Sequence, residues 1–117
     1  MPATLAVVRK LSLDALAREH LETAARSASG RSGTTVYGGH EQVLRQTLVA
    51  MRAGTSMAEH ENPGEATLTV LRGRVRLATA DATWEGRSGD LLVLPPARHS
   101  LEAIEDSVVV LTVAKLR

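Results

Sequence analysis

The first clear pattern along the chain is an amphipathic stretch between residues 12 and 28. Apolar side chains recur there near the helical period, and charged side chains occupy the other side. The positions on the less polar side are Leu13, Leu16, His20, Leu21, Ala24 and Ala25. Ser12 stands where an N-cap is needed, and Asp14 falls in the first turn, where a negative charge is favourable. The sequence therefore predicts one helix over 12–28, with His20 partly packed or on the surface, followed by a flexible Gly/Ser-rich loop at 27–33.

Beyond residue 33 the pattern changes to short β-like runs separated by turn residues. The predicted strands are 34–37, 43–53, two within 66–79, 91–94, 99–104 and 108–114. The segment 66–79 is interpreted as a hairpin that turns at Gly73, with Leu68 and Val70 alternating against polar residues. Short strands at close spacing indicate an all-β sandwich or barrel. We expect one domain, with an N-terminal arm and helix over 1–33 and a barrel over 34–117.

Three arginines stand two positions apart around the expected turn. Arg72, Arg74 and Arg76 would share one face of the hairpin because side chains alternate along a strand. Two interpretations stay open: the arginines bind a phosphate or carboxylate, or they form a solvated strand face that discourages edge pairing.

Composition narrows the function classes. The 117 residues include 14 basic and 13 acidic side chains, a net charge of +1, so no strong field attracts nucleic acid or an anionic membrane. The chain has no cysteine, which removes disulfides, thiolate metal ligands and cysteine nucleophiles. Tyr37 and Trp84 are its only aromatic residues, too few for a platform that stacks bases or flavin rings. The N-terminus lacks a signal-peptide pattern and no stretch has the length of a membrane span, so we expect a cytoplasmic protein.

Two segments carry the strongest chemical signal. The first runs from Gly54 to Gly73 and reads GTSMAEHENPGEATLTVLRG. The second runs from Gly89 to Ala103 and reads GDLLVLPPARHSLEA. Together they resemble the two consensus motifs of the cupin superfamily, over about residues 43–114. The resemblance implies an all-β cupin double-stranded β-helix, a jelly-roll barrel, with the one N-terminal helix packed outside.

The first motif retains the spacing of its glycines and first histidine but differs at its other ligand positions. Gly54, His60 and Gly73 have the family spacing. Asn62 stands where the family has its second His. Ala66 stands where the family has Glu, and Glu65 lies one position earlier.

The second motif is altered in a similar way. Gly89 and Pro95 fit the family pattern, whereas Ala97 replaces the turn glycine. His99 arrives one residue early, and Ala103 replaces the final Asn. The pattern of turns is therefore retained more completely than the ligand set.

These departures bear on metal binding. In metal-dependent cupins three His and one Glu converge on Fe, Mn, Ni, Zn or another divalent ion, which implies His60 and His99 as ligand positions here. An amide such as that of Asn62 is a poor ligand for a transition metal. Glu65 joins the set only if the loop before it absorbs a one-residue shift, which otherwise reverses the facing of a strand residue. We expect no tightly held cofactor, and a weak site for Zn, Fe, Mn, Ni or Cu on His60, His99 and Glu65 stays the alternative.

Strand alternation suggests further pocket residues. Within 43–53, Gln46 shares a face with Leu44, Leu48 and Ala50, which predicts that Gln46 points into the barrel. The predicted ligand-binding set is Gln46, His60, Asn62 and His99. Glu102 alternates with the inward set of its strand and is expected to face out.

Three functions stay open at this point. The preferred hypothesis is a non-catalytic cupin that binds a small molecule or acts as a sensing or interaction module. The first alternative is a metal-dependent enzyme, a dioxygenase or isomerase, that uses His60 and His99. The second is a structural dimer with a vestigial pocket. The expected partners are a small molecule and, from the resemblance, a second copy in a homodimer, with neither nucleic acid nor membrane.

Overall fold

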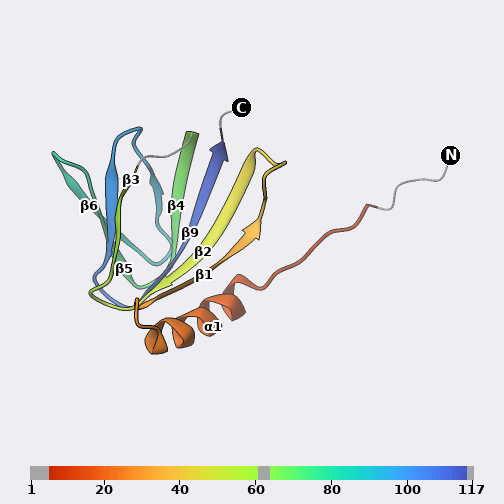
Figure 1. Ribbon diagram of the computed structural model, residues 1–117, viewed down its shortest axis with the longest axis horizontal. Coiled ribbons are helices and arrows are strands. Elements are labelled where there is room, and N and C mark those ends of the chain that lie inside the picture. The colour runs from red at the N-terminus through yellow and green to blue at the C-terminus, as the bar shows by residue number, and fades with distance from the viewer. Residues whose placement is uncertain (1–5, 61–63, 116–117) are drawn as a thin grey trace.

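Two facing antiparallel sheets and one outer helix make up the structure (Figure 1). The computed structural model describes residues 6–60 and 64–115, and only the backbone of Glu59 and His60. The elements are α1 (Leu13–Arg26), β1 (Arg31–Tyr37), β2 (Leu44–Met51), β3 (Ser56–His60), β4 (Gly64–Arg72), β5 (Arg74–Ala78), β6 (Thr83–Arg87), β7 (Leu91–Val93), β8 (His99–Ala103) and β9 (Ser107–Lys115).

The strand order is that of a jelly roll. Within the described residues, one sheet has the order β1-β2-β9-β4-β7 and the other β3-β8-β5-β6. Neighbouring strands pair antiparallel throughout these two sheets. In Figure 1 the sheets meet at the bottom and diverge toward the top, and α1 lies outside, below β1 and β2. This confirms the predicted all-β barrel with an N-terminal helix packed outside.

Aliphatic side chains from both sheets fill the space between them. The buried members are Met51, Ala66, Leu68, Val70, Val75, Leu77, Leu94, Leu101, Ala103, Val109 and Val113. Alternation explains the set, because β4 and β8 each bury every second residue. Full burial of a Val or Leu side chain stabilises the fold by roughly 1.5–3 kcal/mol, so this layer supplies most of the hydrophobic driving force.

The helix covers the outer face of the larger sheet. Ser12 caps α1 as predicted, with its Oγ accepting a hydrogen bond from Ala15 N at 3.1 Å. Ala17 and Ala24 are fully buried, and their small side chains let the helix approach the sheet closely. They pack in a second apolar cluster with Leu48, Ala50, Val108 and Val110. No helix in the described residues is long and apolar enough to cross a membrane.

Two polar contacts fasten α1 to the strands. His20 Nδ1 lies 2.7 Å from Ser32 Oγ on β1, so His20 is partly packed, as expected. Arg72 Nη2 donates to Asp14 Oδ1 at 2.5 Å. Arg72 therefore pairs with the helix, and the prediction that it shares a face with the next two arginines is wrong.

The turn at Gly73 joins different sheets. β4 pairs with β7 and β9, whereas β5 pairs with β6 and β8, so the predicted hairpin is wrong although both of its strands exist. Gly73 has a φ of +83°, and a Cβ there would meet Asp106 O and Ser107 Oγ at the corner between β8 and β9. Turn chemistry is local, but the choice of strand partner depends on distant residues.

Two strands lie where no strand was predicted. β3 (Ser56–His60) follows Gly54, and β6 (Thr83–Arg87) lies between two predicted strands. β6 exposes four of its five residues because it is an edge strand, so its sequence lacks the alternation of a half-buried strand.

Candidate functional site

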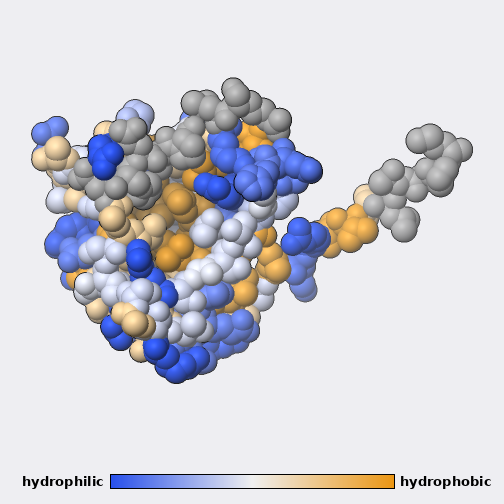
Figure 2. Space-filling model, in the orientation of Figure 1, coloured by the Kyte–Doolittle hydropathy of each residue, from blue (hydrophilic) through white to orange (hydrophobic). Residues whose placement is uncertain are grey.

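The space between the sheets is narrow, and the described side chains that line it are almost entirely apolar. Its lining residues are Val49, Met57, Leu68, Leu77, Leu94, His99, Leu101, Val109 and Leu111. The cavity volume is about 20 Å³, room for about one water molecule. Figure 2 shows apolar residues in the hollow between the sheets. Among the described side chains, the interior therefore offers an apolar surface with one imidazole, that of His99.

His99 is the polar side chain of this interior. It is only 2% exposed, and the other buried polar residue in the described part of the chain, Ser107, serves a strand corner. His99 Nδ1 lies 2.9 Å from Ala97 O, and since a carbonyl only accepts, Nδ1 carries the proton. In the neutral ring Nε2 then holds the lone pair, which suits it to accept a hydrogen bond or bind a cation. Ala97, which replaces the family's turn glycine, thus fixes the ring through its carbonyl group.

The strand register brings the two motif histidines together at the level of the backbone. His60 on β3 stands opposite His99 on β8, after an irregularity that begins at Met57. The side chain of His60 and the whole of Asn62 lie outside the described residues. Their predicted roles in ligand binding stay predictions.

Glu65 does not reach the interior. It is exposed and alternates with buried Ala66 and Leu68, so it lies on the outer face of β4. The structure therefore does not bring Glu65 to His99, which removes Glu65 from the alternative ligand set of His60, His99 and Glu65. The register is not shifted at this point, and Ala66 occupies the inward position.

Gln46 also faces away from the interior. It shares a face with Leu48 and Ala50, as predicted, but those two residues belong to the cluster under α1. Gln46 Nε2 donates to Thr112 Oγ1 at 3.1 Å, and the side chain borders a groove beside the N-terminal arm. The expectation that Gln46 points into the barrel is therefore wrong, because the apolar face of β2 is covered by a helix and not by the other sheet.

The described residues do not fit the four-ligand metal site of the cupin motifs. No three His, Cys, Asp or Glu side chains among them lie close enough to share a metal ion. His99 supplies one imidazole, whereas Ala66 and Ala103 are buried at the positions of the acid and the amide. The side chain of alanine has no ligand atom, so neither position can hold a metal ion through its side chain.

Two further clefts lie where the sheets leave open edges, and the sequence pattern did not reveal them. One of about 340 Å³ is lined by Ser29, Arg31, Ser32, Gly33, Val49 and Met57, between β1 and β3. The other, of about 320 Å³, is lined by Leu77, Trp84, Leu91, Leu92, Val93 and Pro95, between β6 and β7. The first cleft shares Val49 and Met57 with the interior, and the second shares Leu77. Each cleft lies between strands of different sheets, so no local signal in the sequence predicts it.

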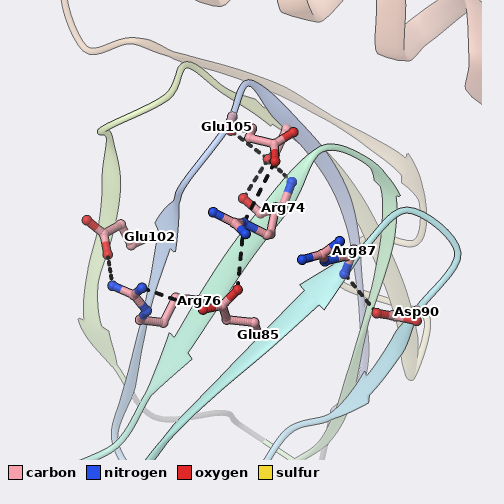
Figure 3. A network of polar contacts seen from close by, with 8 residues as sticks. Arg74, Arg76, Glu85, Arg87, Asp90, Glu102 and Glu105 are labelled. Atoms are coloured by element: carbon pink, nitrogen blue, oxygen red, sulfur yellow. Dashed lines mark hydrogen bonds and ion pairs between the residues drawn. The ribbon is translucent and has the colours of Figure 1, made fainter.

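The outer face of the smaller sheet carries a ladder of opposite charges (Figure 3). Arg74 Nε lies 3.6 Å from Glu85 Oε1 and 3.7 Å from Glu105 Oε2. Arg76 reaches Glu85 at 3.6 Å and Glu102 at 3.3 Å. Glu102 faces out, as expected. The pairing favours the interpretation of Arg74 and Arg76 as a solvated strand face, in which such exposed pairs contribute little stability.

Comparison with solved structures gives fold-level neighbours of different kinds. A conserved Streptococcus pyogenes protein of unknown function has a TM-score of 0.69 and 25% identity, over 78% of this chain and 79% of that chain. A cupin superfamily protein from Desulfitobacterium hafniense has a TM-score of 0.68 and 15% identity, over 74% of this chain and 78% of that one. A variant of salicylate 1,2-dioxygenase from Pseudoaminobacter salicylatoxidans has a TM-score of 0.67 and 22% identity, over 86% of this chain but 32% of that one.

Sequence comparison identifies the family. No curated protein matches the chain. The family model described as Cupin domain matches residues 47–115, the segment that holds both motifs. That match spans more than half of the chain, and the jelly-roll topology agrees with it. The chain therefore belongs to the cupin family.

Proposed function

We propose that this cupin is a non-catalytic binding module whose interior takes the apolar body of a small molecule, with His99 as its polar contact. The observation that carries the proposal is the lining, which combines eight aliphatic or thioether side chains with one imidazole. Small-molecule sites typically have such a lining, with a few polar groups that fix the orientation of the ligand. Among the described residues, no second titratable side chain lines the interior, which supports binding over acid–base catalysis.

The tautomer of His99 indicates which polar groups of a ligand it would bind. Because Nδ1 donates to Ala97 O, the neutral ring offers Nε2 as an acceptor, which suits a ligand hydroxyl or amide N–H. The present volume of about 20 Å³ holds no more than about one water molecule, so ligand entry has to widen the space between the sheets.

Titration with hexanol, followed by NMR of the backbone amides, tests this proposal. We expect saturable shifts at interior positions such as Leu68 and Leu101, and weaker binding to His99→Leu, which keeps an apolar side chain but removes the acceptor. His40→Leu is the matched control because His40 is exposed. Absence of interior shifts in the wild type, or equal affinity in His99→Leu, would overturn the proposal.

The metal-dependent enzyme is tested separately. We expect elemental analysis of untagged protein to find little divalent metal and no change in His60→Ala or His99→Ala. Near-stoichiometric Fe, Mn, Ni, Zn or Cu that disappears in both variants would replace the non-catalytic proposal with an enzymatic one.

We further propose that the protein forms a homodimer through the N-terminal arm and the outer face of β1 and β2. Exposed apolar side chains gather there: Val7, Val8, Leu11, Tyr37, Val43 and Leu44. The arm and the strands border a groove of about 490 Å³. Each chain has one arm and one such groove. In a two-fold dimer the same surface of each copy faces the partner, so the arm and the groove of both copies would be covered. Exposed apolar patches of this kind are typical of interfaces.

A further inference from the structure

We infer that the cleft between β1 and β3 binds the carboxylate of an aliphatic carboxylic acid, with Arg31 as its partner. The inference rests on the proposed function, because the apolar body of the same ligand would enter the interior. It adds the chemical class of the ligand and a second polar contact at the rim.

The cleft and the interior share two lining side chains. Val49 and Met57 line both the interior and the cleft of about 340 Å³. Both residues are half-buried, so each presents one part to the core and another to the opening. The cleft opens widely to solvent, so a charged group of a ligand can lie at its rim. An aliphatic chain bound in the cleft would therefore contact the same apolar surface that lines the barrel.

Gly33 keeps this surface uncovered. A Cβ at Gly33 would lie 3.4 Å from Val49 Cγ2 and 2.8 Å from Leu48 O. Any larger residue would thus cover Val49 and press on the neighbouring strand. The absence of a side chain at this position of β1 leaves Val49 accessible from the cleft.

Arg31 places a positive charge at the rim. Its side chain is exposed, and Nη1 donates to Ser56 O at 3.4 Å, so it crosses from β1 to β3. Among the described residues Arg31 forms no ion pair. Arg74 and Arg76, on the outer face of the smaller sheet, both pair with glutamates. A guanidinium has five N–H donors in a planar fork that matches a carboxylate. One guanidinium also balances the single charge of a carboxylate better than the larger charge of a phosphate monoester.

Parallel NMR titrations with hexanoate and hexanol test the inference. We expect hexanoate to shift the amides of Arg31, Ser32 and Val49, and Arg31→Gln to weaken hexanoate binding roughly tenfold while leaving hexanol binding unchanged. Arg87→Gln is the matched control, because it removes the same charge from an exposed position on β6. Thermal unfolding of both variants shows whether the fold is intact.

The outcomes separate this inference from the proposed function. Equal hexanoate affinity in the wild type and Arg31→Gln would overturn the role of Arg31, and hexanol binding that depends on His99 would still support the interior site. Equal losses in Arg31→Gln and Arg87→Gln would also overturn it, because only the net charge would then matter. If hexanoate binds through Arg31 but hexanol leaves the interior amides unshifted, the rim contact stands and the interior proposal fails.

Discussion

At the scale of single residues, Ser107 shows how a buried hydroxyl stabilises a sharp change of direction. It is fully buried, and its Oγ accepts from Arg74 N at 3.0 Å. The same oxygen lies 3.1 Å from Arg74 O and 2.7 Å from Glu105 O. The hydroxyl thus links the start of β5 to the corner before β9. These hydrogen bonds compensate the energetic cost of burying the hydroxyl, a cost that an isolated buried polar group would retain.

We expect Ser107→Ala to destabilise the protein by about 1–3 kcal/mol, because it leaves the partly buried Arg74 N without its acceptor. Urea unfolding measures the change in the free energy of unfolding. Ser100→Ala, on the partly exposed face of β8, is the control and is expected to change it little. Equal effects of the two substitutions would contradict this role of Ser107.

Two turn glycines allow backbone strain to be separated from steric exclusion. Gly73 and Gly54 both have positive φ, +83° and +88°, but a Cβ at Gly54 would meet open space. Gly54→Ala is expected to cost about 1–2 kcal/mol, the strain of the left-handed region. Gly73→Ala is expected to cost clearly more, because the corner at Asp106 and Ser107 has to move. Denaturant unfolding of both variants checks this order, and equal losses would refute it.

At the scale of elements, the ion pair between α1 and β4 couples helix docking to pH. The hydrogen bond from Arg72, and then its charge, hold the pKa of Asp14 below the ordinary value of 3.8. Since the folded-state pKa is the lower one, the stabilisation is present above the unfolded-state pKa. It is lost as the pH falls through the folded-state value. Asp14 is exposed, so solvent screens the interaction and its contribution is small.

We expect Arg72→Gln to raise the pKa of Asp14 toward its ordinary value, because the charged hydrogen bond is lost. NMR titration of the Asp14 carboxyl carbon measures it directly. Arg18→Gln should raise the pKa of Asp14 less, since Arg18 lies 3.9 Å away and is the weaker influence. A larger rise in Arg18→Gln than in Arg72→Gln would be incompatible with this geometry.

At the scale of the whole molecule, the proposed homodimer depends on an apolar arm beside the barrel. Val8 is 92% exposed on the arm, and Val93 is 76% exposed at the edge strand β7. Sedimentation or light scattering should show a concentration-dependent dimer that Val8→Asp converts to a monomer. Val93→Asp makes the same chemical change outside the proposed interface and should leave the dimer intact. A wild-type monomer at all accessible concentrations would exclude the homodimer.

The local features of the chain could be read from its sequence. The helix and its Ser12 cap, the alternation in β4 and β8, and the turn at Gly73 all depend on neighbouring residues, and the structure confirms them. The motif segments likewise led to the fold and to a buried His99. These features follow from periodicity and backbone sterics, which act over a few residues.

The tertiary structure decided which face of each strand is inside and which strands are neighbours. Gln46 does share a face with two buried residues, but α1 covers that face. Arg72 was misplaced for a related reason, because the sheet partner of its strand depends on contacts with distant residues. The cleft at Arg31 is formed by β1 and β3, which belong to different sheets, so its residues become one site only when the sheets pack. The sequence by itself thus determined the helix, most of the strands and the alternation of their two faces, whereas only tertiary packing assigned those faces to the interior, the helix or solvent.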